Sequence, residues 1–300
     1  MSDPIVAAID CGTNSTRLLV VQGEDALTRR MQTTRLGAGV DKRGTLANDA
    51  IERTLECLRD YRREMDELGV EQIRVSATSA ARDAKNRDVF FDGAEEILGV
   101  RPELLSGEEE GELAFAGATR DLDAADGPFL VVDIGGGSTE LVFGTDSASS
   151  VMSLDIGSVR LTEQYLEHDP ARPEELTACI SITEAWLDDV DREHPEMANA
   201  KTFVGTAGTF TTAAAVEIGL LEYDRDAIHH FALSRNAAED VFRTLATESR
   251  EERIGNPGMP EARADIIVGG MCILVKIMRH FDIDTFVISE SDILDGLARS

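Results

Sequence analysis

Two stretches of the chain join an aspartate at the end of an apolar run to a turn of glycine and hydroxyl residues. The first is IVAAID followed by CGTNST, and the second is FLVVDI followed by GGGST. Backbone N–H groups in such turns can converge on an anion, because glycine tolerates the required dihedral angles and lets the backbone approach closely. Phosphate is the natural occupant, and Asp10 and Asp133 could hold Mg²⁺ beside it, directly or through water. The pattern predicts a metal–phosphate site, although a glycine-rich hairpin can also be only a turn.

The candidate phosphate ligands lie in three turns. Glu140, beyond the second turn, could hold the metal through water or could be a solvated strand residue. The third turn, in VGTAGTFTT, either contacts a nucleotide or only shapes the passage from strand to helix. The phosphate-binding candidates are Gly12, Thr13, Asn14, Ser15, Gly135, Gly136, Gly137, Ser138 and Gly208.

The elements that must position these turns repeat between two halves of the chain. Each half opens with strand, polar turn and strand, which is typical of a β-hairpin, and continues into strands and amphipathic helices. Apolar residues at helical spacing predict a helix over 48–69 that ends at Gly69, and further helices follow 92, 108, 207, 263 and 292. We therefore expect an α/β fold of two related domains, 1–124 and 125–300, with the helix near 290–300 packing back on the first domain.

The composition limits the classes of partner. The chain has 57 acidic and 29 basic residues, a net charge of −28, and so lacks the basic face that nucleic-acid binding requires. It has no apolar run of the ~20 residues that a membrane span needs and no signal peptide, so we expect a cytoplasmic protein without a membrane partner. We also expect a homodimer. So many carboxylates would repel one another in dilute buffer, whereas molar salt shortens the screening length to ~3 Å and weakens that repulsion. The acidic composition therefore suggests a salt-rich cytoplasm.

The quoted segments resemble those of a known group of proteins. DCGTNSTRLLV, DIGGGSTELVFG and VGTAGTFTT are similar to the first phosphate, second phosphate and adenosine segments of the actin-like ATPase and sugar-kinase superfamily. More narrowly, ATSAARDAKN and LSGEEEGELAFAGA resemble the exopolyphosphatase/guanosine pentaphosphate phosphatase family. The resemblance implies two ribonuclease-H-like domains with a cleft between them, and Mg²⁺-dependent release of terminal phosphate from polyphosphate or guanosine pentaphosphate.

The same resemblance assigns two catalytic residues. Glu110, the last acid of SGEEEG, corresponds to the general base that activates water, and Arg82 corresponds to an arginine that neutralises substrate phosphates. Glu108 and Glu109 are the competing acids. Neighbouring positions on a helix point ~100° apart, so the three cannot all face one site, and spacing alone does not choose among them.

Some positions depart from the family pattern, and one other enzyme class shares the turns. Thr13 stands where serine is usual, and Leu294 and Asp295 stand where Arg–Glu is common. Longer family members add helical domains, so processive digestion of long polyphosphate is in doubt for this chain. The alternative function is an ATP-dependent small-molecule kinase of the same superfamily, although the acidic triple after LSG is not its signature.

Overall fold

The computed structural model describes residues 3–300 as two compact units. Of the described residues, the first comprises 3–117 and Ile293–Ser300, and the second comprises Ala118–Asp292. The division falls inside a helix, close to the expected boundary at 124, and the first unit includes the last eight residues, as expected for a terminal helix that packs back on it. None of the described helices has the combination of length and apolar character that a membrane crossing requires.

The first unit is built on a five-stranded sheet in the order β3-β2-β1-β4-β5. Strands β1 (Ile5–Cys11), β2 (Ser15–Gln22) and β3 (Asp25–Thr33) are antiparallel, whereas β4 (Gln72–Ala77) and β5 (Glu103–Leu104) run parallel to β1. The helices of this unit are α1 (Val40–Arg43), α2 (Asn48–Leu68), α3 (Ser79–Asp83), α4 (Arg87–Leu98), α5 (Gly107–Thr119) and α13 (Ile293–Arg299).

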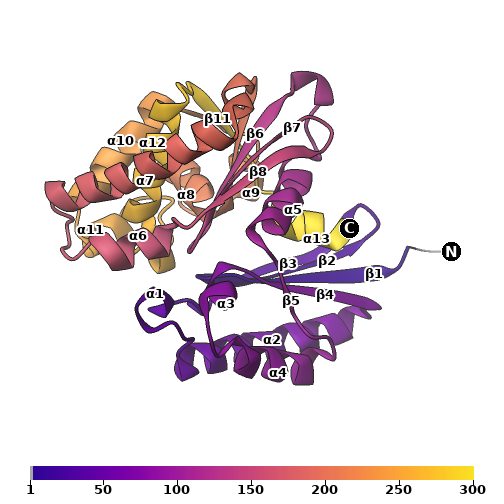
Figure 1. Cartoon of the computed structure of the whole chain (residues 1–300). Coiled ribbons are helices and arrows are strands. Elements are labelled where there is room, and N and C mark those ends of the chain that lie inside the picture. Colours follow the sequence, from indigo (N-terminus) through magenta and orange to yellow (C-terminus); the bar gives the residue numbers. More distant parts are fainter. Residues whose placement is uncertain (1–2) are drawn as a thin grey trace. The chain divides into compact units, whose positions relative to one another are not determined.

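Alternating residues of β1 and β2 cover two cores in the first unit. Ile9 and Val20 belong to the core that α2 and α4 fill, whereas Ala8 and Leu19 pack against Leu297 of α13 on the other face. Figure 1 shows α2 and α4 on one side of the sheet and α13 on the other. Because strand side chains alternate between faces, a central strand that is apolar throughout must be covered twice. The terminal helix supplies the second cover.

The second unit has a six-stranded sheet in the order β10-β11-β9-β6-β7-β8. Its strands are β6 (Phe129–Ile134), β7 (Thr139–Gly144), β8 (Ala148–Leu154), β9 (Thr202–Thr206), β10 (Ala232–Ser234) and β11 (Thr285–Ile288). Strands β6, β7 and β8 are antiparallel in sequence order, and β9 runs parallel to β6, which repeats the arrangement of β1–β4. This shared topology confirms the prediction of two ribonuclease-H-like α/β domains.

Helix α12 is the central helix of the second unit. The helices are α6 (Ser158–Tyr165), α7 (Pro173–Glu193), α8 (Ala207–Ile218), α9 (Arg225–Ile228), α10 (Arg235–Thr247), α11 (Arg250–Ile254) and α12 (Ile267–His280). Helix α12 contacts α6, α7, α8 and α10 (Figure 1). A Cβ on its Gly270 would lie 2.5 Å from Thr209 Oγ1, so glycine there allows α12 to approach α8 closely. Short 3₁₀ helices lie at Ala124–Asp126, Pro195–Asn199 and Glu261–Arg263.

Candidate active site

The first glycine turn, residues 12–15, is fixed so that two of its N–H groups share a direction. Gly12 N donates to Ser15 O at 3.0 Å and closes the turn between β1 and β2. The carbonyls of Thr13 and Asn14 accept hydrogen bonds from Gly37 N and Arg35 N, both at 2.9 Å. In a planar trans peptide the N–H points opposite to the C=O, so the N–H groups of Asn14 and Ser15 point away from the 35–37 segment. Such a pair of amides suits an anion.

The second glycine turn, residues 135–138, has the same construction with different partners. Gly135 N donates to Ser138 O at 3.0 Å, as Gly12 does in the first turn. The carbonyls of Gly135, Gly136 and Gly137 all accept hydrogen bonds from the start of α6. The N–H groups of Gly136, Gly137 and Ser138 therefore point away from α6. The two turns that the sequence predicts as phosphate loops thus share one closing hydrogen bond and one amide arrangement.

The aspartates beside the two turns have different cross-strand neighbours. Asp10 is 2% exposed and lies opposite Arg17 in the β1–β2 pair. Its Oδ2 accepts hydrogen bonds from Arg17 Nη2 at 2.7 Å and Nε at 3.2 Å, and its Oδ1 accepts one from Ser76 Oγ at 3.1 Å. The expected metal ligand Asp10 therefore already has a cationic partner in the first unit.

Asp133 lies opposite a second carboxylate. Its partner across β6 and β7 is Glu140, and the two residues are 7% and 1% exposed. Glu140 Oε1 accepts a hydrogen bond from Ser153 Oγ at 2.8 Å. Like charges directly opposite each other destabilise a sheet, and hard carboxylate oxygens are the ligands that Mg²⁺ prefers. The two expected metal ligands of the second unit therefore fit a divalent cation.

The three adjacent acids of α5 have separate roles in the structure. Glu109 is exposed, and its Oε2 accepts from Ser106 N at 2.8 Å while Ser106 Oγ accepts from Glu109 N at 3.1 Å. This reciprocal pair is a capping box, which lowers the pKa of Glu109. Glu108 is exposed to solvent. Glu110 points inward, with its side chain 14% exposed.

Glu110 and Arg82 form an ion pair inside the first unit. Arg82 Nη1, at the end of α3, donates to Glu110 Oε2 at 2.7 Å and to the carbonyl of Leu105 at 2.9 Å. Burial raises the pKa of Glu110, and the positive charges of Arg82 and Arg17 offset this only in part. The residues that the family resemblance assigns to base and phosphate ligand are therefore in direct contact.

Gly208 lies at the edge of the sheet where the second glycine turn begins. Asp133 of β6 pairs in register with Thr206 of β9, and α8 starts at the next residue, Ala207, with a φ of 64°. The Arg263 guanidinium occupies the space that a Cβ on Gly208 would fill. An arginine from the 3₁₀ helix Glu261–Arg263 therefore lies beside the start of α8.

Comparisons with known proteins match this arrangement over nearly the whole chain. Residues 19–299 match the model of the Ppx/GppA phosphatase family. A Mycobacterium tuberculosis protein named exopolyphosphatase 2 is 41% identical over 98% of both chains. The chain belongs to the Ppx/GppA phosphatase family. A crystal structure of the Aquifex aeolicus member of the Ppx/GppA family is 33% identical, with a TM-score of 0.82 over 98% of this chain and 95% of that one.

Other Ppx/GppA members carry a different name. A Vibrio parahaemolyticus protein named guanosine-5'-triphosphate,3'-diphosphate pyrophosphatase is 30% identical over 99% of this chain, which spans 59% of that relative. A solved exopolyphosphatase from Cytophaga hutchinsonii is 26% identical with a TM-score of 0.90, over 97% of this chain and 96% of that one. The family match confirms the sequence-based prediction of a phosphohydrolase.

A further group of potential metal ligands lies between α6 and α7. Glu167, His168 and Glu175 place potential ligand atoms within 4.8 Å of one another. Both Glu175 oxygens are engaged, however, because Oε2 accepts from Arg172 N at 2.8 Å and Oε1 accepts from His168 Nδ1 at 2.6 Å. Oε1 also accepts from Glu167 N at 3.2 Å, and the bond from Arg172 N ties Glu175 to the residue that precedes α7. The cluster is best explained as a helix cap, and none of the predicted site residues belongs to it.

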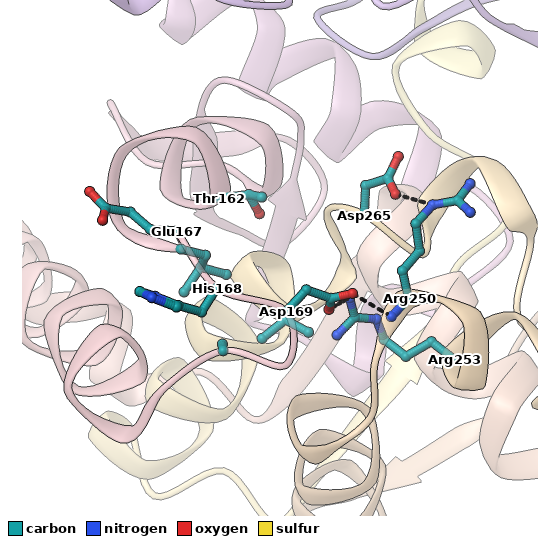
Figure 2. Close-up of a pocket in the computed structure, with 10 residues that line it drawn as sticks. Thr162, Glu167, His168, Asp169, Arg250, Arg253 and Asp265 are labelled. Carbon is teal, nitrogen blue, oxygen red and sulfur yellow. Dashed lines mark hydrogen bonds and ion pairs between the residues drawn. The ribbon is translucent and has the colours of Figure 1, made fainter.

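A cavity of about 220 Å³ adjoins that cap. Figure 2 shows Asp169, Arg250, Arg253 and Asp265 on one side of it, with Asp265 bonded to Arg250, whereas the Glu167 carboxylate points away from them. Asp169 accepts from Arg253 Nη2 at 2.6 Å and from Arg250 N at 2.7 Å. The cavity is lined by Thr162, Leu166, Glu167, His168, Asp169, Ala171, Arg250, Arg253, Asp265 and Val268. Its lining holds three acids and two arginines, so it offers no excess positive charge to a phosphate.

The sequence analysis missed several residues that hold the Ppx/GppA site in place. Arg17 is one of them, and it lies opposite Asp10 in the β1–β2 hairpin. The register of a hairpin with a short turn could have predicted this pair. Arg35 and Arg160 hold loop carbonyls from elements that lie about twenty residues beyond each loop, and no local pattern marks them.

Proposed function

We propose that this protein releases terminal orthophosphate from inorganic polyphosphate or guanosine pentaphosphate by attack of a water molecule. The observation that carries the proposal is the contact between Glu110 and Arg82, the residues that we propose as base and as phosphate ligand. Support also comes from the relatives named exopolyphosphatase and guanosine-5'-triphosphate,3'-diphosphate pyrophosphatase.

The role of each residue follows from its environment. Glu110 accepts a proton from water as the water oxygen bonds to the terminal phosphorus and the bridging P–O bond breaks. Burial raises its pKa, and a carboxylate with a raised pKa is a stronger base. Arg82 can exchange its bond to Glu110 for two oxygens of the terminal phosphate, because a guanidinium binds in a bidentate manner.

The two glycine turns bind phosphate groups of the substrate in this proposal. Their aligned amides face developing negative charge without having to reorganise, and such preorganised donors are usually the largest catalytic term. Gly208 is proposed to contribute by admitting the Arg263 guanidinium beside the start of α8 rather than through its own amide.

Mg²⁺ is the proposed cofactor, with Asp133 and Glu140 as its ligands. These buried carboxylates fit a hard divalent cation, which, when bound, neutralises charge on phosphate oxygens. Asp10 fits the metal less well, because Arg17 and Ser76 donate to its two oxygens. We propose that Asp10 instead orients Arg17 beside the first turn.

Release of phosphate tests the proposal directly. Purified protein is incubated with polyphosphates of graded length and with guanosine pentaphosphate, with Mg²⁺ or with a chelator, at low and at molar potassium chloride. We expect Mg²⁺-dependent release of orthophosphate from at least one of these substrates. Release from neither, together with ATP-dependent phosphorylation of a sugar or carboxylic acid, would instead support the kinase alternative.

A further inference from the structure

The start of α6 donates hydrogen bonds to three successive carbonyls of the second glycine turn. We call Gly157–Arg160 the α6 clamp. Ser158 N and Oγ donate to Gly135 O at 2.9 and 3.2 Å, and Val159 N and Arg160 N donate to Gly136 O at 2.9 and 3.1 Å. Arg160 Nε donates to Gly137 O at 2.7 Å. The first turn of a helix has N–H groups without an intrahelical partner, and here they are satisfied by the loop.

Gly157 lets the clamp approach the loop backbone. A Cβ at this position would lie 2.5 Å from Gly136 O and 2.7 Å from Gly137 N. Its φ of −161° is extended backbone that any residue can adopt, so glycine is required for space and not for conformation. The two backbones are therefore in contact where the loop must keep its shape.

The third carbonyl differs from the first two in what holds it. Gly135 O and Gly136 O accept from backbone N–H groups of α6, whereas Gly137 O accepts from a side chain. The peptide between Gly137 and Ser138 carries the N–H of Ser138. If that peptide rotated, its carbonyl would face the substrate in place of its N–H, and an oxygen would meet a phosphate oxygen.

We propose that Arg160 is a positioning residue of the second glycine turn. Its Nε holds the carbonyl of Gly137, so that Ser138 N–H faces a phosphate of the substrate. Arg160 acts through this peptide and not by contact with the substrate. The inference rests on the proposed function, because it assumes that the second turn binds phosphate.

Four variants separate the hydrogen bond from the charge. Gln carries its Nε2 on Cδ, at the same place in the side chain as Arg Nε, so Arg160→Gln keeps the donor and removes the charge. Arg160→Lys keeps the charge but has a methylene where Nε was, and Arg160→Met removes both. Gln164→Met, at an exposed position of the same helix, is the matched control. Thermal unfolding of each variant checks that it is folded.

The readouts are kcat and KM for phosphate release and the affinity for inorganic phosphate measured by calorimetry. We expect Arg160→Met to lower kcat/KM about 10-fold, mainly through KM, which corresponds to loss of one hydrogen bond. Arg160→Gln should recover most of this loss and exceed Arg160→Lys in both readouts. Gln164→Met should match the wild type.

The opposite ranking, with Arg160→Lys above Arg160→Gln, would show that the charge matters and would overturn the inference. Wild-type behaviour of all three Arg160 variants would overturn it as well. A wild-type protein that binds inorganic phosphate but hydrolyses neither substrate would refute the proposed function alone, and the binding ranking of the variants would still decide the role of Arg160.

Discussion

At the scale of single residues, the contact between Glu110 and Arg82 distinguishes this site from a generic phosphate loop. Glu109 is used by the capping box of α5, and Glu108 faces solvent, so only the third acid of the series turns inward. A helix assigns such roles by angle, because consecutive residues point ~100° apart. The proposed base and the proposed phosphate ligand are therefore selected together by the geometry of α5 and α3.

Removal of Arg82 should impair both binding and turnover. Arg82→Ala deletes a donor to Glu110 and to the substrate, and we expect kcat/KM to fall about 100-fold, a loss typical of removing one preorganised donor. Loss of the positive charge should also raise the pKa of Glu110 further, because Arg82 lowers it. Because the base must be deprotonated to act, the fall in kcat/KM at low pH should then begin at a higher pH than in the wild type, which steady-state kinetics over a range of pH would show. The exposed Arg63→Ala variant is the control, and equal kinetics in both would contradict the assignment.

Some residues of the candidate site could be predicted from the sequence, and others could not. The aspartates and glycines stand in short motifs, so their turns and adjoining strands could be predicted. The choice of Glu110 came from family resemblance, because its spacing is the same as that of its neighbours. The partners that orient the loops, at Arg35, Gly37 and Arg160, could not be predicted, because tertiary folding alone brings them to the loop carbonyls.

At the scale of elements, helix starts carry much of the local organisation. Helix α5 begins with a capping box, α6 begins against a glycine turn, and α7 begins with Pro173 followed by the capping carboxylate of Glu175. Each solves the same problem, which is that the first N–H groups of a helix need acceptors. In α6 the acceptors are the loop carbonyls themselves, so one set of hydrogen bonds both caps a helix and orients a candidate phosphate loop.

The cap of α7 should give a stability contribution that depends on pH. The pKa of Glu175 is lowered from 4.5 to about 2, chiefly by the His168 hydrogen bond and then by Arg172 N. Because the pKa of Glu175 is lower in the folded state than in the unfolded state, its ionised carboxylate stabilises the fold at pH values above the unfolded-state pKa. This contribution is lost as the pH falls toward 2. Glu175→Ala should therefore lower the unfolding temperature at pH 7, and its difference from wild type should shrink between pH 5 and pH 3.

The neighbouring exposed acid supplies the control for this experiment. Glu174→Ala removes a carboxylate from the same first turn without touching the capping box. It should lower the unfolding temperature less than Glu175→Ala does. A difference between Glu175→Ala and wild type that stays constant with pH would contradict the role of the ionised cap.

The elements differ in how far the sequence could predict them. The prediction of a helix over 48–69 is confirmed by α2, which ends where Gly69 adopts a φ of 71°. The predicted hairpins are confirmed as β1–β2 and β6–β7. Strand β3 was not predicted, because six of its nine residues are polar or charged and only its pairing to β2 makes it a strand. Tertiary pairing outweighed local propensity there.

At the scale of the whole molecule, two related sheets each present one glycine turn beside an aspartate. The residue paired with that aspartate across the hairpin differs, because it is Arg17 in the first unit and Glu140 in the second. The first unit therefore pairs its carboxylate with a cation of the protein, while the second has two acids for which we propose a metal. The cleft between the domains, the homodimer and the cytoplasmic location stay predictions.

The net charge of −28 should make the stability of the protein depend on salt. The screening length shortens from ~10 Å at 0.1 M salt to ~3 Å at 1 M, which weakens the repulsion between the acidic residues. The folded state is stabilised more than the unfolded chain, because its charges lie closer together. We expect the unfolding temperature to rise steadily as potassium chloride increases from tenths molar to molar concentrations. An unfolding temperature that falls with potassium chloride would contradict adaptation to a salt-rich cytoplasm.

The most direct test of the account is the turnover of Glu110→Gln, measured beside Glu108→Gln as orthophosphate released from the preferred substrate. If Glu110 activates water, Glu110→Gln should lose about 10²- to 10⁴-fold in kcat while it still binds substrate, and Glu108→Gln should match the wild type. Equal turnover in Glu110→Gln and wild type would contradict the central claim.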